Sequence, residues 1–146
     1  MKKKIPLKIN RPFVFVPMTL DFLHIGHVNI LNHAKKYGNI ILGLVTDRGI
    51  RTYKRNNPIN NYATRKKFAK MLKNIEHIIP VESLEDIISL VKIYKFNYVV
   101  HGDDWKKGPQ TKTRKELIKT VKAWRGKVID VPYTKNISST KIINQL

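Results

Sequence analysis

Short apolar runs that alternate with helix-like patterns constrain the fold of this chain more than any other feature. Continuous apolar runs predict buried strands, and apolar residues at every third or fourth position between them predict helices. The predicted strands are residues 13–16, 40–45, 77–81, 98–100 and 128–131, and the predicted helices are residues 28–37, 63–72, 84–94, 113–124 and 138–146. Strands and helices in alternation favour an α/β fold in which helices cover both faces of a parallel sheet.

The length of 146 residues is typical of one domain and suffices for a hydrophobic core. We predict a basic, loosely ordered tail over residues 1–11 and a single domain over residues 12–146. Only three residues separate the lysines after Met1 from Lys8, so we expect no secretory signal. Because no run approaches the ~20 apolar residues of a membrane span and there is no cysteine, we predict a cytoplasmic protein without a membrane partner.

The charge of the chain predicts an anionic ligand. Its 29 lysines and arginines against 10 acidic residues give a net charge of +19, which attracts nucleotides, phosphorylated metabolites and nucleic acids alike. The lysines are scattered, however, and aromatic residues do not alternate with basic ones as they do in proteins that bind single-stranded nucleic acid. A small anion is therefore the favoured partner, and nucleic acid is not expected.

Polar segments follow four of the five predicted strands. In a parallel sheet, ligands bind beyond the carboxyl ends of the strands, where the chain reverses its direction across the sheet. We therefore expect these segments to form one site. They are residues 18–27, 46–55, 101–106 and 133–141. The second belongs to a long, basic, asparagine-rich stretch, residues 46–61, which we interpret as a mobile loop.

The sequence His24-Ile25-Gly26-His27 lies between the first predicted strand and the first predicted helix. A helix N-terminus presents unpaired N–H groups and positive dipole charge to an anion, and a glycine lets a phosphate approach the backbone. Two imidazoles three positions apart can donate hydrogen bonds to phosphoryl oxygens. Alternatively, the two histidines are zinc ligands, helix caps or surface residues, but no glutamate or cysteine lies at zinc spacing beside them. Phosphate binding is the favoured interpretation.

A second candidate phosphate site is Ile-Ser-Ser-Thr-Lys, residues 137–141, before the last predicted helix. Serine and threonine are also ordinary helix caps, so this motif gains weight only beside the first one. Cations for a triphosphate would come from Lys54 and Arg55 in the predicted loop and from Arg65 at the start of the next helix. Equally basic alternatives nearby are Arg48, Arg51 and Lys66.

Two carboxylates, Asp103 and Asp104, follow the fourth predicted strand, next to Trp105. This segment fits a capped turn that starts at Gly102, a metal-binding pair, or the edge of a nucleoside site. Asp21 is the other carboxylate near the predicted site, and its type and place suit Mg²⁺ bound through water.

Residues 21–27, 102–105 and 137–141, taken together, resemble the cytidylyltransferase family, which includes glycerol-3-phosphate cytidylyltransferase. The similarity follows motif order and spacing over residues 13–146. It implies a Rossmann-like sheet of the HxGH nucleotidyltransferase type and a homodimer. It also implies transfer of CMP from CTP to an anionic acceptor with release of pyrophosphate. We expect Mg²⁺ as the divalent cation of this reaction.

The resemblance also implies roles for single residues. The catalytic positions fall on His24, His27, Lys54 and Arg65, with both histidines on the phosphates. The nucleotide-binding positions fall on Met18, Thr19, Asp21, Gly26, Gly102, Asp103, Trp105, Ile137, Ser138, Ser139 and Thr140. The acceptor-binding positions fall on Tyr133 and Asp104, and Asp21 is the predicted Mg²⁺ ligand.

Two departures from the glycerol-phosphate enzymes bear on the acceptor. Those enzymes carry Gly-Thr-Phe-Asp where this chain has Met-Thr-Leu-Asp at residues 18–21, and an arginine where it has Tyr133. The stretches that look more similar to phosphonate cytidylyltransferases are residues 46–48, 53–55, 100–105 and 131–134. We therefore predict 2-aminoethylphosphonate or a similar small phosphonate as the acceptor. The alternatives are glycerol 3-phosphate, and a non-catalytic module on the same fold that binds anions or nucleic acid.

Overall fold

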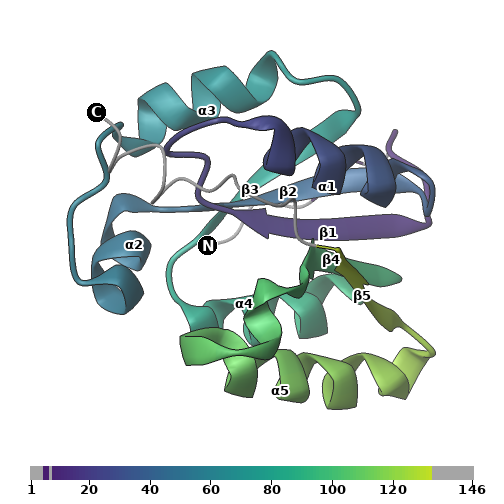
Figure 1. The fold of residues 1–146 in the computed structure, drawn as a ribbon. Helices are drawn as coiled ribbons and strands as arrows, with labels where there is room; N and C mark the ends of the chain where they lie inside the picture. The colour runs from purple at the N-terminus through teal and green to yellow at the C-terminus, as the bar shows by residue number, and fades with distance from the viewer. Residues whose placement is uncertain (1–4, 7, 133–146) are drawn as a thin grey trace.

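In the part of the chain that the structure describes, five parallel strands form one sheet in the order β3-β2-β1-β4-β5 (Figure 1). This computed structural model of the chain describes residues 5–6 and 8–132. The strands are β1 (Phe13–Met18), β2 (Asn39–Val45), β3 (Ile75–Val81), β4 (Tyr98–Gly102) and β5 (Lys127–Val131). Every neighbouring pair is parallel, with Val14 of β1 opposite Ile40 on one side and Tyr98 on the other. The pairing confirms the parallel sheet that the alternating pattern predicts.

Helices cover both faces of the sheet, as predicted (Figure 1). They are α1 (Ile25–Lys35), α2 (Asp47–Lys54), α3 (Tyr62–Lys70), α4 (Leu84–Tyr94) and α5 (Thr111–Val121). Successive side chains of a strand point to opposite faces. Val14 therefore packs in one core layer with residues of α1 and α3, whereas Phe15 packs in the other with residues of α4 and α5.

The chain reverses its direction across the sheet between β1 and β4. Strands β2 and β3 lie on one side of β1, and β4 and β5 lie on its other side. Helix α1 leaves β1 on one face, while α5 follows β4 on the opposite face (Figure 1). Such a divergence opens a crevice at the carboxyl ends of the two neighbouring strands.

The prediction of a mobile loop over residues 46–61 is wrong for its first half, where the structure has helix α2. Thr46 caps this helix by accepting a hydrogen bond from the Gly49 N–H at 3.1 Å, and Ile50 is buried beneath it. Sequence periodicity missed the helix because its apolar face consists of Ile50 and Tyr53 alone, too few residues to stand out as a stripe. The helix is held by its cap and by tertiary contacts instead.

The described part of the predicted N-terminal tail packs against the rest of the chain, so the prediction of loose order is wrong there. Ile5 and Ile9 are buried in the core layer that contains Phe15. The Arg11 guanidinium donates hydrogen bonds to the carbonyls of Tyr94 and Lys95, each at 2.8 Å. The charge pattern indicated solvent exposure, but the two isoleucines supply enough apolar surface to hold the segment down.

Element boundaries differ from the predicted ones by a few residues. Helix α1 begins at Ile25 rather than at residue 28, so His27 lies in its first turn. Between β4 and α5 the chain forms two short 3₁₀ segments, Asp103–Lys106 and Gly108–Gln110. The predicted loop at 133–137 and the predicted last helix lie outside the described residues.

No helix in the described part of the chain combines the length and the apolar character needed to cross a membrane.

Candidate active site

A cavity opens at the carboxyl edge of the sheet, in the crevice between β1 and β4. The described residues that line it are Pro17, Met18, Thr19, His24, Gly26, His27, Ile30, Val45, Tyr53, Lys54, Val81, Ser83, Leu84, Ile87, His101, Gly102, Asp104, Gln110 and Pro132. Three of the four predicted polar segments therefore contribute to one wall or another. The fourth segment follows Pro132 directly and lies outside the described residues.

The first turn of α1 forms one wall of the cavity. His24 is the N-cap of the helix, and its Nδ1 accepts a hydrogen bond from the Gly26 N–H at 3.1 Å. In return, the Nδ1 of His27 accepts a hydrogen bond from the backbone N–H of His24 at 3.2 Å. The two rings lie next to each other, with centroids 4.0 Å apart. Two imidazoles thus perform the reciprocal capping that helices usually obtain from a hydroxyl and a carboxylate.

The capping bonds determine which nitrogen of each histidine carries the proton. A neutral imidazole has one N–H, so an Nδ1 that accepts a hydrogen bond leaves the proton on Nε2. Burial lowers the pKa of His24. Burial, followed by the charges of His24 and Lys54, lowers the pKa of His27 to about 4. At neutral pH both rings are uncharged Nε2–H donors beside the positive end of the α1 dipole, a combination that suits phosphoryl oxygens.

Helix α2 brings Tyr53 and Lys54 to the same cavity. Burial lowers the pKa of Lys54, while the charges of Asp21 and Asp104 act in the opposite direction. Burial raises the pKa of Tyr53 to about 12, so its hydroxyl remains a neutral donor. Together with the two imidazoles, these side chains supply the mixture of cation and neutral donors that binds a polyphosphate.

The end of β4 forms another wall, which rests on a buried tryptophan. His101 lines the cavity, its Nδ1 donates to the Gly102 carbonyl at 2.8 Å, and its ring stacks on Trp105 with centroids 4.4 Å apart. Trp105 donates its indole N–H to Asp130, which a bidentate pair of bonds from Arg114 also holds. Trp105 is only 2% exposed and does not line the cavity. The structure therefore places it behind His101, outside the described cavity lining.

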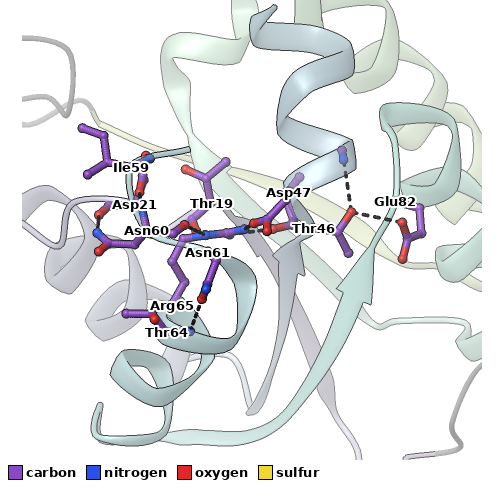
Figure 2. Close-up of polar contacts among 12 residues, drawn as sticks. Thr19, Asp21, Thr46, Asp47, Ile59, Asn60, Asn61, Thr64, Arg65 and Glu82 are labelled. Carbon is purple, nitrogen blue, oxygen red and sulfur yellow. Dashed lines mark hydrogen bonds and ion pairs between the residues drawn. The ribbon is translucent and has the colours of Figure 1, made fainter. Parts of the chain in front are cut away.

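Two other predicted site residues are bound by protein groups. The two carboxylate oxygens of Asp21 accept backbone N–H bonds, one from Ile59 at 2.8 Å and one from Asn60 at 2.7 Å. Arg65 is fully buried, and its guanidinium donates to backbone carbonyls and to Asp47 (Figure 2). Neither Asp21 nor Arg65 is part of the described lining. Both hold the loops around the cavity in place.

The described residues hold no complete metal site by themselves, and Asp21 as a ligand of Mg²⁺ bound through water stays a prediction. Among them, no group of three or more histidine, aspartate and glutamate side chains could hold a metal ion. Asp21, the predicted ligand, already accepts two backbone hydrogen bonds. The carboxylate that remains in the described lining is Asp104 alone.

The predicted residues fall into three groups. Those that the structure brings together at the cavity are Met18, Thr19, His24, Gly26, His27, Lys54, Gly102 and Asp104. Those that lie outside the described lining are Asp21, Arg65, Asp103 and Trp105. Those that lie outside the described residues are Tyr133, Ile137, Ser138, Ser139 and Thr140.

Four polar lining residues were not predicted individually, namely Tyr53, Ser83, His101 and Gln110, although Tyr53 and His101 lie within the predicted segments 46–55 and 101–106. Ser83 obeys the rule that located those segments, because it lies just beyond the carboxyl end of β3. Ser83 gave little signal because one capping serine looks like any other helix start. The position of Tyr53 at the cavity depends on helix α2, which was not predicted. Gln110 ends a short 3₁₀ segment that was not predicted either.

Comparisons with known proteins agree with this geometry. The family model described as cytidylyltransferase-like matches residues 16–145. Glycerol-3-phosphate cytidylyltransferase of Bacillus spizizenii is 30% identical over 125 residues, which are 85% of this chain and 88% of that protein. The bifunctional protein HldE of Aliarcobacter butzleri is 32% identical over 99 residues, 66% of this chain and 21% of HldE. This chain therefore corresponds to about a fifth of that longer relative.

A solved structure shares the fold. The lipopolysaccharide core biosynthesis protein from Thermoplasma volcanium superimposes with a TM-score of 0.66 at 23% identity, covering 86% of this chain and 98% of that one. The family match extends from β1 past the last described residue and so includes the described cavity lining from Pro17 onward. On this evidence, the chain belongs to the cytidylyltransferase-like family.

Proposed function

We propose that this protein transfers CMP from CTP to a small phosphonate and releases pyrophosphate. The observation that carries the proposal is the N-terminus of α1, where His24 and His27 present neutral N–H donors to the cavity that Lys54 also lines. Preorganised donors of this kind stabilise charge that develops in a transition state. Membership of the cytidylyltransferase-like family supports CTP as the nucleotide.

In the proposed reaction, a phosphonate oxygen of the acceptor attacks the α-phosphorus of CTP, in line with the oxygen that bridges to the β-phosphorus. A new P–O bond joins the acceptor to CMP. The bond to the bridging oxygen breaks, and its electron pair leaves with pyrophosphate. Because a phosphonate is already anionic at neutral pH, the attack needs no protein base. The imidazoles and Lys54 contribute by positioning the reactants and by compensating negative charge.

Asp104 supports an acceptor with a cationic head. It is the only carboxylate of the described lining, and its side chain is 58% exposed. In a cavity for polyanions a carboxylate repels phosphate, but it attracts an ammonium group. The acceptor 2-aminoethylphosphonate carries such an ammonium two carbons from its phosphonate. The similarity of residues 100–105 to phosphonate cytidylyltransferases supports the same choice.

Glycerol 3-phosphate is a second candidate acceptor, because the Bacillus spizizenii relative is named for it and is covered over most of its length. Its phosphate would use the same attack on CTP. Against it stands Tyr133, which occupies the position where the glycerol-phosphate enzymes carry an arginine.

An assay of pyrophosphate release tests the function. CTP and ATP are each combined with 2-aminoethylphosphonate, 2-hydroxyethylphosphonate, glycerol 3-phosphate and phosphocholine. We expect release with CTP and 2-aminoethylphosphonate, and we expect Asp104→Asn to raise the KM of that acceptor about tenfold without changing that of the hydroxyl analogue. Release with glycerol 3-phosphate alone would select the second acceptor. No release with any pair, together with salt-sensitive DNA binding, would favour a non-catalytic module.

Two further expectations from the family resemblance join the proposal. Mg²⁺ bound to the phosphates of CTP would enter as part of the substrate, and chelation by EDTA in the same assay tests that dependence. A homodimer would show a mass of twice 17.0 kDa in light scattering.

A further inference from the structure

Among the described residues, Arg65 is the only charged side chain that is fully buried. It lies in the first turns of α3, and its guanidinium is surrounded by acceptors (Figure 2). Its Nε donates to the Asn60 carbonyl at 2.9 Å. Its Nη1 donates to the carbonyls of Thr19 at 2.7 Å and Val45 at 2.6 Å, and its Nη2 donates to the Asp47 carboxylate at 2.7 Å.

Three of these four acceptors lie on segments that build the cavity. Thr19 follows β1 on the way to His24, and Val45 is the last residue of β2. Both residues line the cavity. Asp47 is the first residue of α2, whose last residue is Lys54. One guanidinium therefore connects the histidine-bearing segment, the end of a central strand and the lysine-bearing helix.

Asp21 extends the same network on the side of the loop before α3. Its carboxylate accepts the N–H groups of Ile59 and Asn60, and its carbonyl accepts a bond from the Asn60 side-chain amide at 2.7 Å. Figure 2 shows Asp21 and Asn60 beside Arg65. The loop between β1 and α1 is thus tied to the loop that begins α3, and Arg65 joins both to β2 and α2.

We propose that Arg65 is a positioning residue that fixes helix α2, and with it Lys54, relative to His24 and His27. A guanidinium presents its donors in a rigid plane, so its bonds hold the connected segments at set separations. Turning these donors toward a phosphate would leave buried carbonyls without a partner, which is unfavourable. Arg65 therefore acts on the reaction through Lys54, in place of the direct catalytic contact predicted from the resemblance. The catalytic consequence rests on the proposed function.

Hydrogen exchange tests the positional part without requiring turnover. In Arg65→Lys the ammonium cannot reach all four acceptors, so we expect the amides of α2 to exchange about tenfold faster while those of α4 remain unchanged. Asp47→Asn keeps the acceptor oxygen but removes the counter-charge, and it carries the same test if Arg65→Lys does not fold. Arg125→Lys, an exposed arginine outside this network, is the matched control. Unchanged exchange in α2, or equal acceleration in α2 and α4, would overturn the proposal.

A double-mutant cycle tests the catalytic part. Arg65→Lys should lower kcat/KM about tenfold in the wild-type background but less than about twofold in a Lys54→Ala background, because its effect passes through Lys54. Equal losses in both backgrounds would show that Arg65 acts on the substrate independently. If the wild-type protein released no pyrophosphate, the proposed function would fail, whereas the exchange experiment would still decide the positional claim.

Discussion

Substituting His27 by asparagine and by glutamine separates the two tasks of this side chain. Its Nδ1 accepts a hydrogen bond from the His24 backbone N–H at 3.2 Å, and its Nε2–H is left to donate in the cavity. The amide oxygen of asparagine reaches roughly where Nδ1 lies, so His27→Asn keeps the cap and loses the donor. The amide nitrogen of glutamine reaches roughly where Nε2 lies, so His27→Gln keeps a donor and loses the cap.

The two losses have different sizes and different readouts. Removing a preorganised donor to developing charge costs about 3 kcal/mol, or about a hundredfold in kcat. Removing a helix-capping acceptor costs about 1 kcal/mol, which corresponds to a Tm lower by about 2–4 °C in a chain of this size. We expect His27→Asn to lose about a hundredfold in kcat with a Tm near that of the wild type. His27→Gln should show the lower Tm and retain kcat within about tenfold.

The measurements are kcat for pyrophosphate release at saturating CTP and Tm by circular dichroism, both near pH 7.5. His33→Gln serves as the matched control, because His33 lies on the same helix but is not part of the described lining. A His27→Asn variant with wild-type kcat would refute the assignment of the donor. So would a His27→Gln variant that is inactive at an unchanged Tm, since the two tasks would then not divide between the two nitrogens as argued.

Three further perturbations test the electrostatics and packing of the site. The pKa of His27 falls from 6.5 to about 4 on folding, so between these values the unfolded chain binds more protons. The free energy of unfolding should therefore drop by on the order of 3 kcal/mol from pH 6.5 to pH 4 in urea titrations, and His27→Asn should flatten this dependence. Lys54→Met should raise the KM for CTP about tenfold, whereas the exposed Lys67→Met should not; an unchanged KM would remove Lys54 from the site. A Cβ at Gly49 would lie 2.8 Å from Val45 Cγ1 and 3.0 Å from the Val81 carbonyl. Gly49→Ala should cost about 1–3 kcal/mol of stability and lower kcat by shifting α2, and an unaltered urea midpoint would contradict that tight contact.

Local patterns in the sequence were enough to predict the sheet, four of the five α-helices that the structure describes, and the place of His24 and His27 at the start of a helix. Buried strands appear as apolar runs, and the start of a helix depends on residues within one turn of it, so His24 and His27 could be placed without a structure. The edge on which polar segments gather also follows from sequence, because all parallel strands end on one side. The same reasoning found Gly102 and Asp104, which line the cavity.

The positions of Arg65, helix α2 and Trp105 depend on bonding partners that are distant in the chain. Arg65 looks like an exposed cation in its own helix, yet its acceptors include Asp47, 18 positions away, and Thr19, 46 positions away. Helix α2 has one buried isoleucine and forms because Thr46 and Asp47 find their contacts, and Trp105 is withdrawn from the cavity by its bond to Asp130. A buried polar group is tolerated only when its hydrogen bonds are met, and no nearby stretch of sequence says which remote carbonyl or carboxylate will meet them.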